Sequence, residues 1–168
     1  MKTNFAAQIS AGRAIVLTLA LGLGLMSTAA LAETCPPEHR LTTPRVLDAI
    51  PSKSLTREVI ANIRLEGWRD MGGFVFRMRR LEMPPGGFVP THSHDDRPAI
   101  VYLVKGTVTE HNSLCAVPIV HTSGSVTEEF GEGFSHWWEN TGNEVVTFIS
   151  TDILPYDSDA APFVGFEP

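Results

Sequence analysis

The chain has 168 residues, of which 43% are hydrophobic and 19% charged, and its formal net charge is −6. This length corresponds to one ordinary domain, and the composition excludes a disordered chain and a coiled coil. The excess of acidic residues argues against nucleic acid and anionic membrane surfaces as partners, because both are bound mainly through Lys and Arg.

The first 32 residues have the pattern of a secretory signal peptide. Residues 1–13 carry two charges, on Lys2 and Arg13, and the 19 residues from 14 to 32 carry none. This stretch ends in Ala-Leu-Ala, the small-residue exit typical of a cleavage site. An uncleaved anchor is the alternative, since 19 uncharged residues can just span a bilayer. We predict cleavage after residue 32 and export to the periplasm or the exterior, leaving a mature chain that has no membrane segment.

The mature chain would contain both cysteines, Cys35 and Cys115. Disulfides persist in the oxidising compartments that exported proteins enter. Two cysteines allow a single intrachain bridge, and we predict that it ties the N-terminal arm to a loop of the main domain. Two separate thiols, one of them buried, are the alternative.

Residues 33–70 are predicted to form an N-terminal arm. Four prolines within residues 33–52 forbid a long regular element there. Residues 54–65 fit either a helix or a strand, because their apolar positions match both periods.

An alternating stretch follows the Gly72-Gly73 pair. Phe74, Phe76 and Met78 share one face of a strand, whereas Leu81 and Met83 have the other parity. The switch predicts a β-bulge near residues 79–80. The basic run at residues 77–80 is expected on a solvated or salt-bridged sheet surface.

The remaining signals are short strands separated by Gly and Pro turns, which argue for an all-β sandwich or barrel over residues 71–153. The tail over residues 154–168 is predicted to be loose. The predicted strands cover residues 99–104, 107–110, 117–121, 126–130, 135–139 and 144–153.

His92 and His94 are two residues apart just after a turn. On a strand, such residues point to the same side. Two imidazoles inside a small barrel need polar partners, and one metal ion supplies a partner to both.

The surrounding pattern resembles the cupin family. The first cupin motif, G-x5-H-x-H-x3–4-E-x6-G, is matched from Gly86 to Gly106, with Ala99 in place of the glutamate. The second motif, G-x5-P-x-G-x2-H-x3-N, is matched by Gly133, His136 and Asn140, while Gly131 stands in the proline position and the leading Gly124 is displaced by one residue.

The resemblance implies a double-stranded β-helix, a jelly-roll barrel, with a metal site on His92, His94 and His136. It implies a divalent ion, Fe(II) as first choice and Zn, Mn or Ni as alternatives. It also implies that two chains can pair as a homodimer.

Ala99 leaves three hypotheses open. In the first, three histidines suffice for the metal; three neutral ligands then leave the +2 charge uncompensated, so the site should attract an anionic or chelating small molecule. In the second, another carboxylate replaces the glutamate, with Glu110, Asp95 and Asp96 as candidates. Alternatively, the metal is lost and the histidines bind a ligand directly.

The functional prediction is a metal-dependent, dioxygenase-like enzyme acting on a small molecule, with Glu110 as the candidate catalytic carboxylate. The rival is a non-catalytic sugar- or metabolite-binding cupin without a bound metal. His111 and His121 are candidates for a supporting role if they are neighbours across a hairpin, although surface or core histidines are the more ordinary interpretation. The predicted pocket walls are Ala99, Val101, Trp137 and Trp138.

Overall fold

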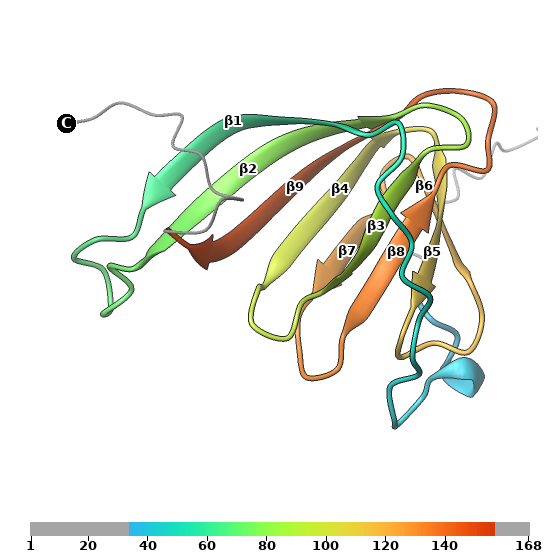
Figure 1. Cartoon of the computed structure of the whole chain (residues 1–168), viewed down its shortest axis with the longest axis horizontal. Coiled ribbons are helices and arrows are strands. Elements are labelled where there is room, and N and C mark those ends of the chain that lie inside the picture. Colours follow the sequence, from blue (N-terminus) through green and yellow to red (C-terminus); the bar gives the residue numbers. More distant parts are fainter. Residues whose placement is uncertain (1–33, 157–168) are drawn as a thin grey trace, which may run out of the picture.

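The computed structural model describes residues 34–156. The predicted signal peptide therefore lies outside the described residues, as does all but the start of the predicted tail. Two antiparallel sheets face each other across the core (Figure 1). Among residues 34–156, no helix is long and apolar enough to cross a membrane.

The chain passes back and forth between the two sheets, which is the path of a double-stranded β-helix. The all-β jelly-roll prediction is thus confirmed. The five-stranded sheet has the order β1 (Thr56–Arg64), β2 (Phe74–Met83), β9 (Val146–Pro155), β4 (Ala99–Lys105) and β7 (Val126–Glu129). The four-stranded sheet has the order β3 (Phe88–Ser93), β8 (Ser135–Glu139), β5 (Thr107–Asn112) and β6 (Ile119–Thr122).

The ambiguous segment at residues 54–65 forms strand β1, which pairs with β2 at the edge of the larger sheet. The sheet therefore extends into the segment that we assigned to the arm. The rest of the arm contains the short 3-10 helix η1 (Pro37–His39) and follows the smaller sheet, with Arg40 bridging to Cys115. The predicted disulfide between Cys35 and Cys115 is present, with a Cα–Cα distance of 5.8 Å.

Strand β2 corrects the prediction of a bulge near residues 79–80. Its register with β9 is unbroken from Phe74 to Met83, and the irregularity lies in β1, between Val59 and Ala61. The inward positions are Val75, Arg77, Arg79, Leu81 and Met83, whereas the aromatic residues of β2 point outward. The parity appeared to switch because the inner face of this strand carries two arginines.

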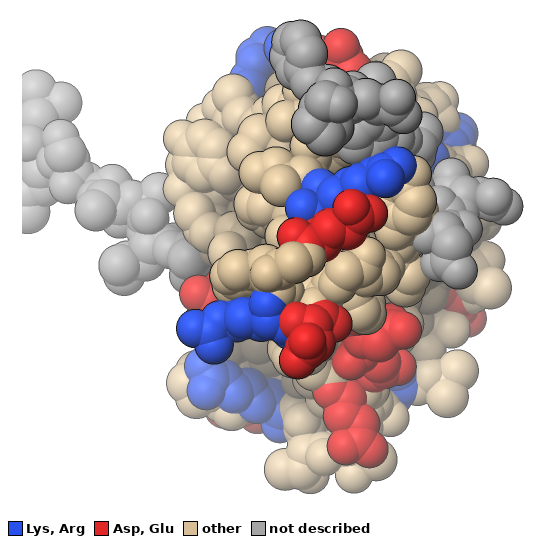
Figure 2. Space-filling model, turned by 90° about the vertical axis from the view of Figure 1, so that its left-hand side faces the viewer, with Lys and Arg blue, Asp and Glu red and all other residues tan. Residues whose placement is uncertain are grey.

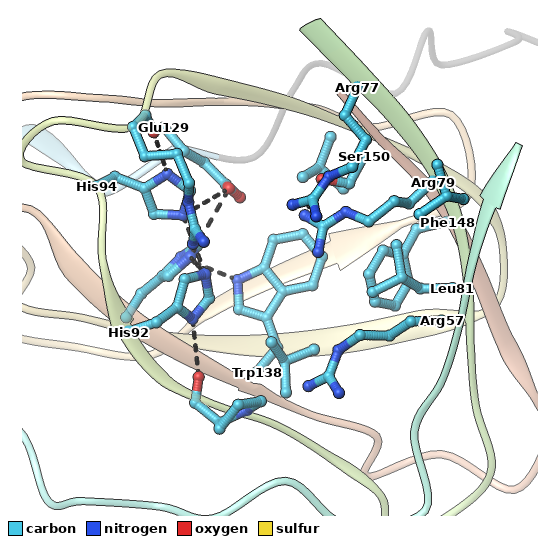
Figure 3. Close-up of a pocket in the computed structure, with 16 residues that line it drawn as sticks. Arg57, Arg77, Arg79, Leu81, His92, His94, Glu129, Trp138, Phe148 and Ser150 are labelled. Atoms are coloured by element: carbon cyan, nitrogen blue, oxygen red, sulfur yellow. Dashed lines mark hydrogen bonds and ion pairs between the residues drawn. The ribbon is translucent and has the colours of Figure 1, made fainter. Parts of the chain in front are cut away.

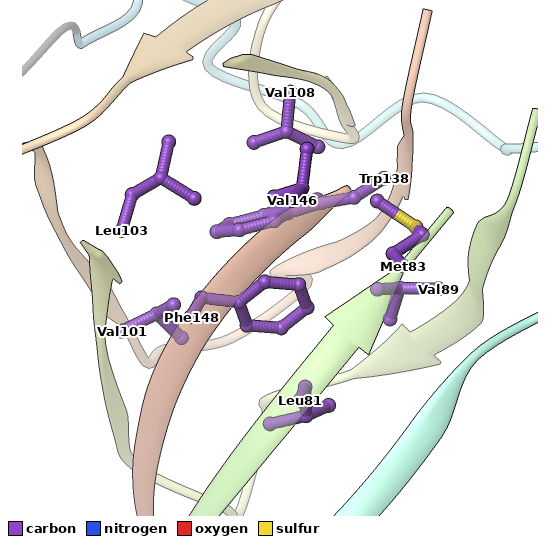
Figure 4. Close-up of a cluster of buried hydrophobic side chains, with 9 residues drawn as sticks. All are labelled: Leu81, Met83, Val89, Val101, Leu103, Val108, Trp138, Val146 and Phe148. Atoms are coloured by element: carbon purple, nitrogen blue, oxygen red, sulfur yellow. The ribbon is translucent and has the colours of Figure 1, made fainter. Parts of the chain in front are cut away.

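The hydrophobic core lies between the sheets and brings strands of both together (Figure 4). Phe148 of β9 packs against Trp138 of β8 with ring centroids 5.4 Å apart. Burial of each large side chain contributes roughly 1.5–3 kcal/mol, so this cluster is the main apolar stabilisation of the sandwich. The cluster consists of Leu81, Met83, Val89, Val101, Leu103, Val108, Trp138, Val146 and Phe148.

Figure 2 shows the end of the molecule that lies at the left of Figure 1. Acidic and basic side chains are interspersed on this face. The side chains visible there therefore form no continuous basic stripe of the kind a phosphate backbone requires.

Candidate metal centre

The strand register brings the three histidines together. His92 lies on β3 directly opposite His136 on β8, and His94 follows the end of β3. The backbone N–H of His94 donates to the carbonyl of Phe134 at 2.8 Å, which extends the pairing by one step. The side chains of His94 and His136 are buried, and that of His92 is half-buried.

The imidazole nitrogens of the three residues converge on one point. His92 Nε2 lies 3.0 Å from His94 Nε2 and 3.2 Å from His136 Nε2. All three candidate ligand atoms lie within 4.8 Å of one another. Metal–nitrogen bonds of about 2.1 Å at right angles put neighbouring ligand atoms about 3 Å apart. The spacing therefore fits three ligands of a single ion.

The opposite nitrogen of each ring is held by an acceptor. His92 Nδ1 lies 2.8 Å from the carbonyl oxygen of Pro90, and His94 Nδ1 lies 2.7 Å from that of Arg97. A carbonyl oxygen only accepts, so both rings carry their proton on Nδ1 and keep the Nε2 lone pair free. Lone pairs facing one another at this distance repel, and a cation between them removes the repulsion. The donor set thus fits a metal ion.

His136 is oriented by a buried carboxylate. Glu110 Oε1 lies 2.8 Å from His136 Nδ1, closer than the indole nitrogen of Trp138 at 3.2 Å. The shorter, charge-assisted contact decides that Nδ1 donates to Glu110. When the imidazole of His136 is neutral, as it must be on a metal ion, its Nε2 also presents a lone pair to the cluster.

The charge states follow from burial and neighbouring groups. Burial, together with the charge of His136, lowers the pKa of His92 to about 2 and that of His94 to about 4. Burial alone would also lower the pKa of His136, but the nearby carboxylates of Glu129 and Glu110 outweigh it and raise that pKa. His92 and His94 are thus neutral near pH 7, as metal ligands must be.

Glu129 is the site residue that the sequence analysis missed. It ends strand β7, its side chain is 3% exposed, and its Oε2 lies 3.2 Å from His94 Nε2. Burial raises the pKa of this carboxyl group. The signal that would have found it is the pairing of β4 with β7, which sets Glu129 opposite Ala99.

The carboxylates that the sequence analysis offered in place of the motif glutamate do not lie among the Nε2 atoms. Glu110 sits behind His136 and does not face the Nε2 atoms, because its two oxygens accept from Asn112, His121 and His136. Asp95 and Asp96 are exposed in the loop after β3, where Asp95 accepts from the backbone N–H of Gly133.

The two remaining candidate histidines face different environments. His121 is buried and its Nε2 lies 2.8 Å from Glu110, which links it through Glu110 to His136. His111 stacks on Trp137 with ring centroids 3.8 Å apart and pairs with Glu139 at 2.9 Å. The two histidines are therefore not neighbours across the β5–β6 hairpin, where His121 lies opposite Val108.

A cavity of about 420 Å³ opens beside the histidines. Val101 and Trp138 line it, whereas Ala99 and Trp137 are not among its lining residues. Figure 3 shows Trp138 beside the histidines, and Phe148 and Leu81 on the wall that adjoins the core. The aromatic and aliphatic side chains give this part of the cavity an apolar wall.

Arginines form the wall opposite the histidines. Arg77, 2% exposed, binds Asp152 through two hydrogen bonds of 3.0 and 2.7 Å, and Arg79 reaches the same carboxylate at 3.0 Å. The expectation of a solvated or salt-bridged sheet surface holds for Arg80, which is exposed and paired with Glu82. It is wrong for Arg77 and Arg79, whose side chains point into the cavity (Figure 3). Arg57 and Arg97 also line it. One Asp152 carboxylate offsets only one of the guanidinium charges, so this wall is positive.

The chain has the double-stranded β-helix fold, and the three histidines that match the cupin motifs converge within it. A comparison with protein-family models found no match. An oxalate-binding protein from Thermotoga maritima is 35% identical over 75 residues, which are 45% of this chain and 60% of that protein. The match thus spans less than two thirds of this relative.

Solved cupin structures are also similar. A Cupin 2 conserved barrel domain protein from Salinispora arenicola is 16% identical with a TM-score of 0.46, covering 64% of this chain and 85% of that one. A predicted oxalate decarboxylase from Thermotoga maritima is 26% identical with a TM-score of 0.42, covering 64% of this chain and 99% of that one.

Proposed function

We propose that this chain is an exported cupin that holds one divalent metal ion on His92, His94 and His136 and binds a small anionic molecule at that ion. The observation that carries the proposal is the convergence of three Nε2 atoms whose rings are each held at Nδ1 by an oxygen acceptor. Such a set of lone pairs has a cation as its natural partner.

The charge of the cavity supports an anionic ligand. Four arginines line it, and the described carboxylates in contact with them belong to Asp152 alone. Guanidinium groups bind carboxylates through paired hydrogen bonds. A small carboxylate with one end on the metal and the other near the arginines suits both walls, and the name of the oxalate-binding relative agrees with this ligand class.

The chemistry we propose is of dioxygenase-like type with Fe(II) as first choice and Zn, Mn or Ni as alternatives. A bound ion supplies open coordination positions and polarises the ligand that occupies them. The chain contributes the orientation of the imidazoles, the apolar wall formed by Trp138 and Phe148, and the arginines that hold the anion. Oxygen uptake by the iron-loaded protein with small carboxylates tests this activity.

A non-catalytic binding cupin that keeps the metal ion is the second candidate, and the similarity to an oxalate-binding protein favours it. The two candidates differ in one readout. A binding protein retains the carboxylate unchanged after prolonged incubation with metal and oxygen, whereas an enzyme consumes it.

In both of these candidate functions the protein holds a metal ion, and the metal content of the purified protein tests this shared requirement. The protein, purified after export and measured by elemental analysis, should contain close to one divalent ion per chain, and His92→Ala and His136→Ala should lose it. Calorimetry should then detect oxalate binding that disappears with a chelator. Metal content that is low in the parent protein and unchanged in both variants would overturn the proposal.

The leader pattern and the disulfide support export to the periplasm or the exterior. Intact mass of the exported protein should correspond to a chain that begins at Glu33. A mass that includes the first 32 residues would contradict cleavage.

A further inference from the structure

We propose that Glu129 supplies the carboxylate that Ala99 lacks, as a fourth ligand of the metal ion provided from the neighbouring strand. This inference rests on the proposed metal site and adds to it a residue at a position that neither cupin motif contains. The carboxylate comes from β7, whereas the motif places its glutamate on β4.

The distances place Glu129 among the ligand atoms. Its Oε2 lies 3.2 Å from His94 Nε2 and 3.7 Å from His136 Nε2. The histidine nitrogens themselves are separated by 3.0 and 3.2 Å. Neighbouring ligands of one ion lie about 3 Å apart, so Oε2 has the spacing of a further ligand.

The strand register explains how Glu129 can take the place of a glutamate at position 99. Ala99 and Glu129 are direct partners in the antiparallel pairing of β4 and β7. Side chains of such partners lie on the same side of the sheet, about 5 Å apart at their Cβ atoms. Both residues are buried. A small residue at 99 therefore leaves room for the carboxylate of Glu129 to reach the site that a glutamate at 99 would occupy.

The hydrogen bonds of Glu129 leave one oxygen for the ion. Thr127 Oγ1 donates to Oε1 at 3.0 Å, whereas Oε2 is the oxygen that faces His94 and His136. A buried carboxylate requires a compensating cation or hydrogen-bond donors. The ion offers that compensation, and the carboxylate in turn offsets half of the ion's +2 charge.

The other acidic residues near the three histidines are not placed to act as the fourth ligand. Both oxygens of Glu110 are already occupied by donors on the far side of His136. Asp95 is exposed, and its two oxygens accept from Ser93 Oγ and from the backbone N–H of Gly133. With four protein ligands, a six-coordinate ion keeps two open positions, enough for a carboxylate bound through one oxygen together with dioxygen.

Metal affinity tests the inference directly. Competition with a chelator should show that Glu129→Gln weakens Mn(II) or Zn(II) binding at least about tenfold, comparable with the loss of other site partners. Glu128→Gln is the matched control, because Glu128 is the exposed neighbour on the same strand; its affinity should be unchanged. The double variant Ala99→Glu/Glu129→Ala returns the carboxylate to the motif position and should recover affinity to within about threefold of the parent protein.

The outcomes separate this inference from the proposed function. Full affinity in a folded Glu129→Gln, together with loss of metal in His92→Ala, would overturn the role of Glu129 and leave the histidine site intact. Metal retained by both variants would overturn the proposed function itself. If the double variant does not fold, a crystal structure of the parent protein loaded with Mn(II) or Zn(II) gives the same answer: Glu129 Oε2 should lie within bonding distance of the ion, and an ion bonded to the histidines but not to Glu129 would contradict the inference.

Discussion

At the scale of single residues, the centre depends on what holds the outer nitrogen of each imidazole. Two rings rely on backbone carbonyls, of Pro90 and Arg97, which no side-chain substitution removes. His136 relies on Glu110, whose carboxylate also accepts from Asn112 and His121. Burial would raise the pKa of Glu110, but the hydrogen bonds from His121 and His136 lower it below its ordinary value. Glu110 is therefore a positioning residue.

Substitution of Glu110 should weaken metal binding indirectly. In Glu110→Gln, His136 loses its charged acceptor, and partners of metal-bound histidines typically account for about 10–100-fold in affinity. Chelator competition measures the loss, and His111→Gln, which removes a histidine on the outer face, serves as the control. An unchanged affinity in Glu110→Gln would show that the His136 ring is held by its packing alone.

At the scale of strands, β2 and β9 are joined inside the sandwich by an ion pair. Removing one partner of a buried pair leaves an uncompensated charge and costs about 3–5 kcal/mol. Asp152→Asn should therefore destabilise the fold by that amount in urea unfolding, since Arg77 and Arg79 both depend on Asp152. Glu82→Gln, which breaks the exposed pair with Arg80, should cost less than about 1 kcal/mol. Equal effects of the two substitutions would contradict the buried pair.

The strands also show what could be predicted from the sequence. The H-x-H pair and the spacing around His136 identified three converging residues, because period-2 geometry and a motif are local properties. Arg77 and Arg79 were assigned to the surface, since the partner that allows their burial, Asp152, is 75 residues away from Arg77. Glu129 was missed for the same reason: only the register of β4 with β7 sets it opposite Ala99. Long-range pairing is not visible in a single strand's pattern.

At the scale of the whole molecule, the N-terminal arm is fastened to the sandwich. The disulfide closes a sequence separation of 80 residues, and the arm also pairs with the loop through hydrogen bonds from Leu41 to Leu114 and from Ala116 to His39. The arm therefore covers one end of the smaller sheet and belongs to the folded domain.

Loss of this bridge should destabilise the domain. The double variant Cys35→Ser/Cys115→Ser should unfold at lower urea concentration, with the loss of about 2–4 kcal/mol that is typical of a disulfide. Addition of a reductant should lower the free energy of unfolding of the parent protein by a similar amount and leave that of the double variant unchanged. A parent protein insensitive to reductant would contradict a stabilising role of the bridge.

The central claim is that the two sheets enclose a metal centre. Anomalous diffraction from crystals of the protein soaked in Mn(II) tests it most directly. We expect one strong peak in the cavity, bonded to Nε2 of His92, His94 and His136. Crystals that show no peak at this position, although the three imidazoles are ordered and accessible, would contradict the claim.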